Sequence, residues 1–222
     1  MTISKHTNNK STAIPKLTNI KGIVFDMDGT LCLPQNWMFK EMRQAVGLTD
    51  RSKDILQYIE SLPTLESQKA ANDGIEQVEL KAMQLMQPQP GLNELMEYLT
   101  INSISKNICT RNKITPVNAL IGKFIDTKYS KFDYILTRDF QPTKPSPEPL
   151  LYIKNRLDSS SNNNVGKMVM VGDSIDDMKS GRYAGFITIL LLNENNSYLV
   201  ADNSEHKHLV DYTITRLDEL II

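Results

Sequence analysis

Two aspartates separated by one residue, Asp26 and Asp28, lie in the segment Phe25–Leu31 (FDMDGTL), at the end of a short apolar run. Side chains two positions apart on an extended segment point to the same side, so we expect the two carboxylates to converge beyond the end of a strand. In open parallel sheets this edge is where ligands bind. The alternative is a solvated turn, because an Asp-x-Asp pattern alone is common.

A second acidic cluster lies in the segment Val171–Met178 (VGDSIDDM), which ends another apolar run. Gly172 allows tight passage of the chain, and Asp173 falls at the predicted strand end. Asp177 lies four residues later and would share the side of Asp173 on a beginning helix. Helix capping is the alternative, since Asp and Ser are favoured N-caps. Capping does not explain why two acidic clusters both follow buried strands.

Two further strand ends carry groups that suit an anion. Thr110 and Arg111 follow one apolar run and supply a hydroxyl and exposed backbone N–H groups, which bind phosphate oxygens well. Lys144 follows another run and stands between Pro142 and Pro145. A lone lysine is usually solvated, but these rigid flanks indicate a fixed position.

A sheet is needed to bring these residues together. Continuous apolar runs predict strands that are buried on both faces. These strands are Ile20–Phe25, Ser105–Cys109, Phe132–Leu136, Lys167–Val171, Ile187–Leu192 and Tyr212–Ile214. Segments with helical periodicity lie between them, at Gly91–Thr100, Pro116–Ile125, Pro147–Leu157 and Asp176–Ala184. The alternation predicts an α/β fold with a doubly wound, mainly parallel sheet that is covered on both faces.

The stretch from Cys32 to Gln89 interrupts this alternation, because it contains no convincing strand. Three helical segments are predicted in it, at about Trp37–Val46, Asp50–Leu62 and Thr64–Met86. We therefore expect a small all-helical domain of residues 32–89, inserted after the first strand of a core domain of residues 20–31 and 90–222. Residues 1–19 are expected to be a disordered tail.

Composition excludes several classes of protein. The 222 residues include 25 Lys plus Arg and 26 Asp plus Glu, for a net charge of -1. This balance argues against nucleic acid or an anionic membrane as the main partner, and no apolar run approaches the ~18 residues of a transmembrane helix. Two cysteines, Cys32 and Cys109, fit a reducing compartment. We expect a cytoplasmic monomer, with a nuclear location or weak organellar targeting left open.

The motifs DMDGTL, a strand that ends before Thr110, Lys144 in KPSPEP, and GDSIDDMKSGRYAG occur in this order along the chain. Together they resemble the four motifs of the haloacid-dehalogenase-like (HAD) hydrolase superfamily. The resemblance runs from about Ile20 to the C-terminus, and the helical insert corresponds to the cap that many members carry. The stretches CLPQNWMFKEMR and ICTRN are most similar to fungal-type hydrolases of this superfamily.

The resemblance implies a Rossmann-like core and a role for each motif residue. Asp26 would attack phosphorus and form an aspartyl-phosphate. Asp28 would protonate the leaving alcohol and then activate the hydrolytic water. Thr110 and the N–H of Arg111 would bind the phosphoryl oxygens, and Lys144 would offset their negative charge.

The resemblance also implies Mg²⁺, held by the carboxylates of Asp26 and Asp173 and the backbone carbonyl of Asp28. Asp177 would be a supporting partner behind the ligands, in preference to Asp176. A count of charges leads independently to a metal, because a phosphate dianion and two ionised carboxylates oppose one lysine. A divalent cation reduces this deficit, and ligands that are all oxygen favour magnesium over zinc.

The predicted function is hydrolysis of a small phosphorylated metabolite by a magnesium-dependent phosphatase. The alternative is a phosphomutase of the same superfamily, which phosphate release without a bisphosphate activator would exclude. A catalytically silent binding module is a third possibility. Other phosphatase chemistries lack their residues, because neither cysteine has an arginine six positions later and all three histidines lie near the chain ends.

The cap is expected to select the substrate. Residues 32–89 carry six basic and eight acidic side chains, which leaves no basic platform for a long polyanion. Trp37, Lys40 and Arg43 on the first cap helix are the candidate substrate contacts; the alternative is a solvated basic face beside a buried aromatic. A cap of this size should close over the catalytic edge and favour small phosphomonoesters over phosphoproteins.

Overall fold

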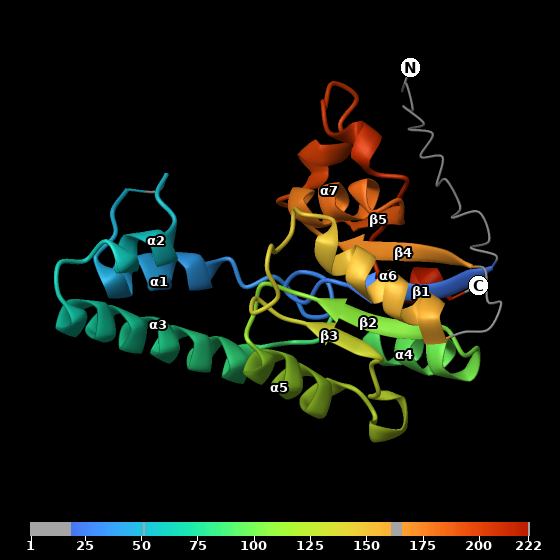
Figure 1. Ribbon diagram of the computed structural model, residues 1–222, viewed down its shortest axis with the longest axis horizontal. Helices are drawn as coiled ribbons and strands as arrows, with labels where there is room; N and C mark the ends of the chain where they lie inside the picture. Colours follow the sequence, from blue (N-terminus) through green and yellow to red (C-terminus); the bar gives the residue numbers. More distant parts are fainter. Residues whose placement is uncertain (1–18, 51, 161–165, 222) are drawn as a thin grey trace, which may run out of the picture.

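Six parallel strands form a single sheet in the computed structural model, which describes residues 19–50, 52–160 and 166–221 (Figure 1). The strands are β1 (Ile20–Phe25), β2 (Ser105–Cys109), β3 (Tyr134–Leu136), β4 (Lys167–Gly172), β5 (Ile187–Leu191) and β6 (Tyr212–Ile214). Their order across the sheet is β3-β2-β1-β4-β5-β6, so the chain starts in the middle and winds to both sides. The predicted doubly wound α/β fold is confirmed, while residues 1–18 of the predicted tail lie outside the described residues.

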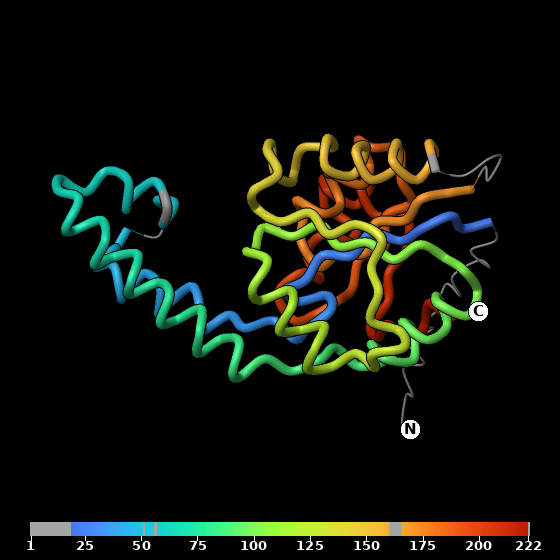
Figure 2. The backbone as a smooth tube through the Cα atoms, turned by 60° about the horizontal axis from the view of Figure 1, so that its bottom comes forward, coloured from blue at the N-terminus to red at the C-terminus, as the bar shows by residue number. Residues whose placement is uncertain are grey.

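Helices cover both faces of this sheet (Figures 1 and 2). One face carries α4 (Leu92–Ile101) and α5 (Ile114–Phe124), and the other carries α6 (Glu148–Ser160) and α7 (Ile175–Tyr183). Short 3₁₀ helices complete the chain at η1 (Thr127–Tyr129), η2 (Ser197–Val200), η3 (Lys207–Leu209) and η4 (Leu217–Leu220). Among the described residues, no helix combines the length and the apolarity that crossing a membrane requires.

Alternation along β1 explains why its sequence is apolar without interruption. Ile23 and Phe25 pack into the apolar cluster under α4 and α5, whereas Val24 packs into the cluster under α6. Successive side chains of a strand point to opposite faces, and both faces of this strand are covered. The continuous apolar run is therefore the pattern of a central strand in a parallel sheet.

Three helices between β1 and α4 extend beyond the carboxyl ends of the strands as a separate arm (Figures 1 and 2). They are α1 (Trp37–Val46), α2 (Ile55–Glu60) and α3 (Leu65–Leu85). The arm has its own apolar core, made of Met42, Ile59, Ala71, Ile75 and Val78. We call this arm the cap.

The second cap helix is shorter than predicted, because it begins at Ile55 rather than Asp50. The Asp50 carboxylate accepts hydrogen bonds from the backbone N–H and the hydroxyl of Ser52. Such a local bond competes with helix formation. Asp54 then accepts a hydrogen bond from the N–H of Gln57, the position of a helix N-cap.

Register brings the predicted site residues to one edge of the sheet. Phe25, the last residue of β1, pairs with Ile108 of β2 and with Val171 of β4. These three strands therefore end at the same level, and the residues that follow them, Asp26 and Thr110 among them, emerge side by side. β1 also lies where the direction of winding reverses, which is the usual ligand-binding crevice of such sheets.

Two helical glycines provide a test of how tightly α7 packs on the sheet. A Cβ on Gly181 would lie 2.7 Å from Thr188 Cγ2 and 2.8 Å from Met170 Cβ, whereas a Cβ on Gly122 of α5 would meet open space. Gly181→Ala is expected to lower the free energy of unfolding by about 1–3 kcal/mol through overpacking. Gly122→Ala should raise it by up to about 1 kcal/mol, because alanine favours helix.

Urea unfolding followed by circular dichroism measures both glycine variants. If the free energy of unfolding changed equally and in the same direction in both variants, the close approach of α7 to β4 and β5 would be contradicted.

Candidate active site

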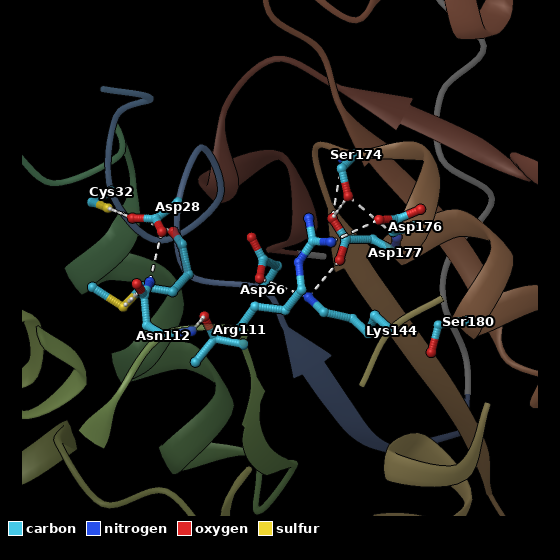
Figure 3. Close-up of polar contacts among 12 residues, drawn as sticks. Asp26, Asp28, Cys32, Arg111, Asn112, Lys144, Ser174, Asp176, Asp177 and Ser180 are labelled. Carbon is cyan, nitrogen blue, oxygen red and sulfur yellow. Dashed lines mark hydrogen bonds and ion pairs between the residues drawn. The ribbon is translucent and has the colours of Figure 1, made fainter. Parts of the chain in front are cut away.

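A buried lysine joins two aspartates at the carboxyl edge of the sheet (Figure 3). Lys144 Nζ donates hydrogen bonds to Asp26 Oδ1 at 2.7 Å and to Asp177 Oδ1 at 2.5 Å, and its side chain is only 3% exposed. Burial alone would lower the pKa of Lys144, but the carboxylates of Asp177 and Asp26 hold it above the ordinary value. Lys144 is therefore a fixed positive charge at the end of β1.

Asp177 is held in place by the first turn of α7. Its Oδ2 accepts hydrogen bonds from the N–H of Ser174 at 3.0 Å and from the Ser174 hydroxyl at 2.6 Å, while the hydroxyl accepts from the N–H of Asp177. This is a reciprocal capping box. A Cβ on Gly172 would lie 2.4 Å from Asp177 Cβ, so only glycine fits there. One oxygen of the Asp177 carboxylate therefore caps α7, and the other accepts the hydrogen bond from Lys144.

Asp173 is oriented by asparagines in the loop after β5. Asn193 Nδ2 donates to Asp173 Oδ2 at 2.9 Å, and Asn196 Nδ2 donates to the backbone carbonyls of Asp173 and Leu191, each at 2.8 Å. Gly29, with a φ of 78°, passes so close that a Cβ would lie 2.0 Å from Asp173 Oδ2. The loop after β1 and the loop after β5 therefore enclose this carboxylate from two sides.

The carboxylate of Asp28 has partners different from those of Asp26. Asn112 Nδ2 donates to Asp28 Oδ2 at 2.6 Å, and the thiol of Cys32 donates to Oδ1 at 3.7 Å (Figure 3). Asn112 is itself placed by a hydrogen bond from its N–H to Thr110 Oγ1 at 3.1 Å. Both aspartates of the Asp-x-Asp pair line the same cavity, but one side chain turns to Lys144 and the other to Asn112.

Thr110 and Arg111 occupy different depths of the site. Thr110 is buried at the end of β2, whereas the side chain of Arg111 is 58% exposed and pairs with Asp176 Oδ2 at 3.0 Å. This ion pair joins the loop after β2 to the first turn of α7. The predicted residues from β1, β2 and β4, together with Lys144, therefore line one cavity.

The carboxylates at this edge of the sheet outnumber the cations beside them. Burial raises the pKa of Asp26 to about 7 and that of Asp173 to about 8. The carboxylates of Asp177 and Asp28 also raise the pKa of Asp26, and those of Asp26 and Asp177 also raise the pKa of Asp173. Burial likewise raises the pKa of Asp28. One lysine does not neutralise this group, so a bound cation would favour its ionised state.

The donor set fits a hard divalent cation. Asp26, Asp173 and Asp177 each offer a carboxylate oxygen, and these atoms lie within 4.8 Å of one another. Mg²⁺ prefers such oxygen ligands. Because both oxygens of Asp177 already accept hydrogen bonds, Asp26 and Asp173 have the better-placed free oxygen positions.

The cavity has a volume of about 520 Å³ and is lined by both the core and the cap. Of the three predicted cap contacts, Arg43 lies on its wall, where the guanidinium donates to the carbonyls of Asp50 and Lys53 at 2.9 Å. Trp37 packs against the apolar core of the cap, under the ammonium of Lys81, which lies 4.7 Å from the ring centroid. Lys40 is exposed.

The sequence patterns predicted no role for Asn112, Asn193 or Asn196. Asn112 lies in the conspicuous segment ICTRN, and the other two lie in a polar segment directly after β5. The position of each segment at a strand end was the available signal. A sequence alone does not show which amide reaches which carboxylate.

The order of the strands and the helices on both faces define a Rossmann-like α/β protein with a cap, and comparison with known proteins gives its family. Residues 20–185 match the model of the haloacid dehalogenase-like hydrolase family. The chain belongs to this family. A hydrolase of Saccharomyces cerevisiae is 57% identical over 205 residues, which cover 92% of this chain and 91% of the yeast protein.

Two solved structures show the same fold. A predicted phosphoglycolate phosphatase of Haemophilus somnus aligns with 92% of this chain and 97% of its own, with a TM-score of 0.65 and 15% identity. A proposed β-phosphoglucomutase of Thermotoga maritima aligns with 90% of this chain and 97% of its own, with a TM-score of 0.63 and 17% identity.

Removal of the amide that orients Asp173 tests the metal site. Asn193→Ala is expected to raise the dissociation constant for Mg²⁺ about tenfold to a hundredfold, because partners behind a ligand fix its orientation. Isothermal titration calorimetry of the purified protein with MgCl₂ measures this constant. Asn195→Ala, an exposed position in the same loop, should leave it unchanged. Equal affinities in the wild type and the Asn193 variant would show that this hydrogen bond does not organise the site.

Proposed function

We propose that the protein is a magnesium-dependent phosphatase that hydrolyses a small phosphate monoester through an aspartyl-phosphate on Asp26. The observation that carries this proposal is the pairing of Asp26 with buried Lys144 at 2.7 Å, in a cavity that also contains Asp28. The two similar solved structures, whose names refer to phosphate esters, support the same class of substrate.

In the first step, a carboxylate oxygen of Asp26 attacks phosphorus, and the bond between phosphorus and the alcohol oxygen breaks. Asp28 gives its proton to that leaving oxygen, so the alcohol departs neutral. The raised pKa of Asp28 favours the protonated form that this step needs. The phosphoryl group remains on Asp26 as a mixed anhydride.

In the second step, Asp28 takes a proton from water, and the water oxygen attacks phosphorus. The bond between phosphorus and Asp26 breaks, which releases inorganic phosphate and restores the Asp26 carboxylate. Asp28 ends protonated, as it began. Asn112 donates to Oδ2 of Asp28 at 2.6 Å, whereas Oδ1 accepts only the long, weak hydrogen bond of the Cys32 thiol at 3.7 Å. Oδ1 is therefore the oxygen better placed to exchange the proton.

Negative charge on the phosphoryl oxygens is balanced by residues from three loops. The hydroxyl of Thr110 and the N–H of Arg111 would bind these oxygens, and Lys144 would place its ammonium beside both Asp26 and the phosphoryl group. The carboxylates of Asp26 and Asp173, with the carbonyl of Asp28, would hold Mg²⁺. When bound, this ion supplies charge neutralisation that brings an anionic nucleophile and an anionic substrate together.

The cavity volume supports a small metabolite as the substrate. Buried free thiols at Cys32 and Cys109 support a reducing compartment such as the cytoplasm.

Replacement of the nucleophile gives the direct mutational test. Asp26→Asn should lower phosphate release about a thousandfold or more, because an amide does not form the covalent intermediate. Release of phosphate from p-nitrophenyl phosphate with Mg²⁺ measures the effect. Asp158→Asn, which alters an exposed partner of Lys21 on the core, is the matched control and should retain turnover.

Retention of most activity in the Asp26 variant would rule out Asp26 as the nucleophile. Phosphate release by the wild type without an added bisphosphate separates a phosphatase from a phosphomutase, which would return the phosphoryl group to a sugar.

A further inference from the structure

The cavity above the catalytic edge has two walls of different character. The core wall carries the aspartates, Thr110 and Lys144, and is polar. The cap wall includes a group of large apolar side chains from α1, α2 and α3. These are Met38, Phe39, Met42, Ile55 and Ile75.

Phe39 distinguishes this wall from an ordinary cap core. Met42 and Ile75 belong to the apolar core of the cap and are each only 8% exposed. Phe39 is 60% exposed although it lines the same cavity. A single exposed apolar side chain needs no explanation, but one that continues an apolar wall inside a binding cavity offers a surface for a ligand.

The charged groups on the cap wall that line the cavity include more carboxylates than cations. Among the described cap residues that line the cavity, Arg43 is the one cation, against Asp54 and Glu79. The Arg43 guanidinium already donates to two loop carbonyls. On the core side, Arg138 Nη1 and Lys113 Nζ each lie 3.8 Å from a carboxylate oxygen of Glu79.

We propose that the substrate is a monophosphate whose alcohol carries an alkyl chain or an aromatic ring, and that this apolar group packs on Phe39 and the neighbouring cap wall. The inference rests on the proposed phosphatase function and names its substrate class. It disfavours sugar bisphosphates, because a second phosphate that faces the cap would meet one cation, Arg43, beside the two carboxylates of Asp54 and Glu79. Phe39 is then a specificity-determining residue.

Two alkyl phosphates separate this inference from the proposed function. Ethyl phosphate and n-hexyl phosphate have leaving alcohols of similar acidity, so a difference in their kcat/KM reports contacts of the chain rather than chemistry. The full-length enzyme with Mg²⁺ is expected to favour n-hexyl phosphate about tenfold or more. Glycerol 1-phosphate, which has a polar chain, should resemble ethyl phosphate.

Phe39→Ala should reduce the ratio of the kcat/KM for n-hexyl phosphate to that for ethyl phosphate about fivefold or more. Leu65→Ala is the matched control, because Leu65 is a cap residue that is 84% exposed and is not among the described residues lining the cavity. Its ratio should equal that of the wild type. Thermal unfolding of both variants confirms that the fold is retained.

Equal kcat/KM values for the two alkyl esters, or a preference for glycerol 1-phosphate, would overturn the inference and leave the phosphatase function standing. An unchanged ratio in the Phe39 variant would also overturn it. Absence of turnover with every ester, p-nitrophenyl phosphate included, would overturn the phosphatase function and the inference together.

Discussion

Charge compensation around one buried ammonium is the constraint on which the site depends. Lys144 lies between Asp26 and Asp177 and is almost completely removed from water. A buried charge without a partner is strongly destabilising, so these three groups stabilise one another only as a set. The charges of this set do not cancel, and Asp173 adds a further carboxylate beside it. When these carboxylates are ionised, the site lacks positive charge, and a divalent cation would supply it when a phosphate dianion enters.

The fold meets this constraint by gathering short segments from many parts of the chain. Strands β1, β2 and β4 end at one level, and the capping box of α7 fixes the carboxylate that faces Lys144. The cap adds a wall that carries no catalytic aspartate and that combines large apolar side chains with Arg43, Asp54 and Glu79. Under the proposed function, chemistry and selection of the substrate would fall to different parts of one cavity. Changes on α1 would then alter which alcohol is accepted while the catalytic edge stays constant.

Local sequence signals were sufficient for the sheet and for the residues at its strand ends. Continuous apolar runs indicated buried strands, and Asp26 and Asp173 were identified because each directly follows one. Asn112 and Asn193 were not identified, because their function depends on which carboxylate each amide reaches across the folded chain. The prediction that α2 begins at about Asp50 was wrong for a related reason, because the helix begins at Ile55. Side-chain hydrogen bonds of Asp50 compete with the helix, and apolar periodicity does not detect them.

Covalent transfer to Asp26 is the central claim, and its most direct measurement is mass spectrometry of enzyme quenched in acid during turnover. Steady-state reaction with p-nitrophenyl phosphate and Mg²⁺, followed by rapid quenching and peptic digestion at low pH, preserves an acyl phosphate for analysis. Nucleophilic catalysis by Asp26 predicts a phosphoryl group on the peptide that contains Asp26, with fragment ions that place it on that residue. Phosphate release from an enzyme that never carries this group, or that carries it on another residue, would contradict the claim.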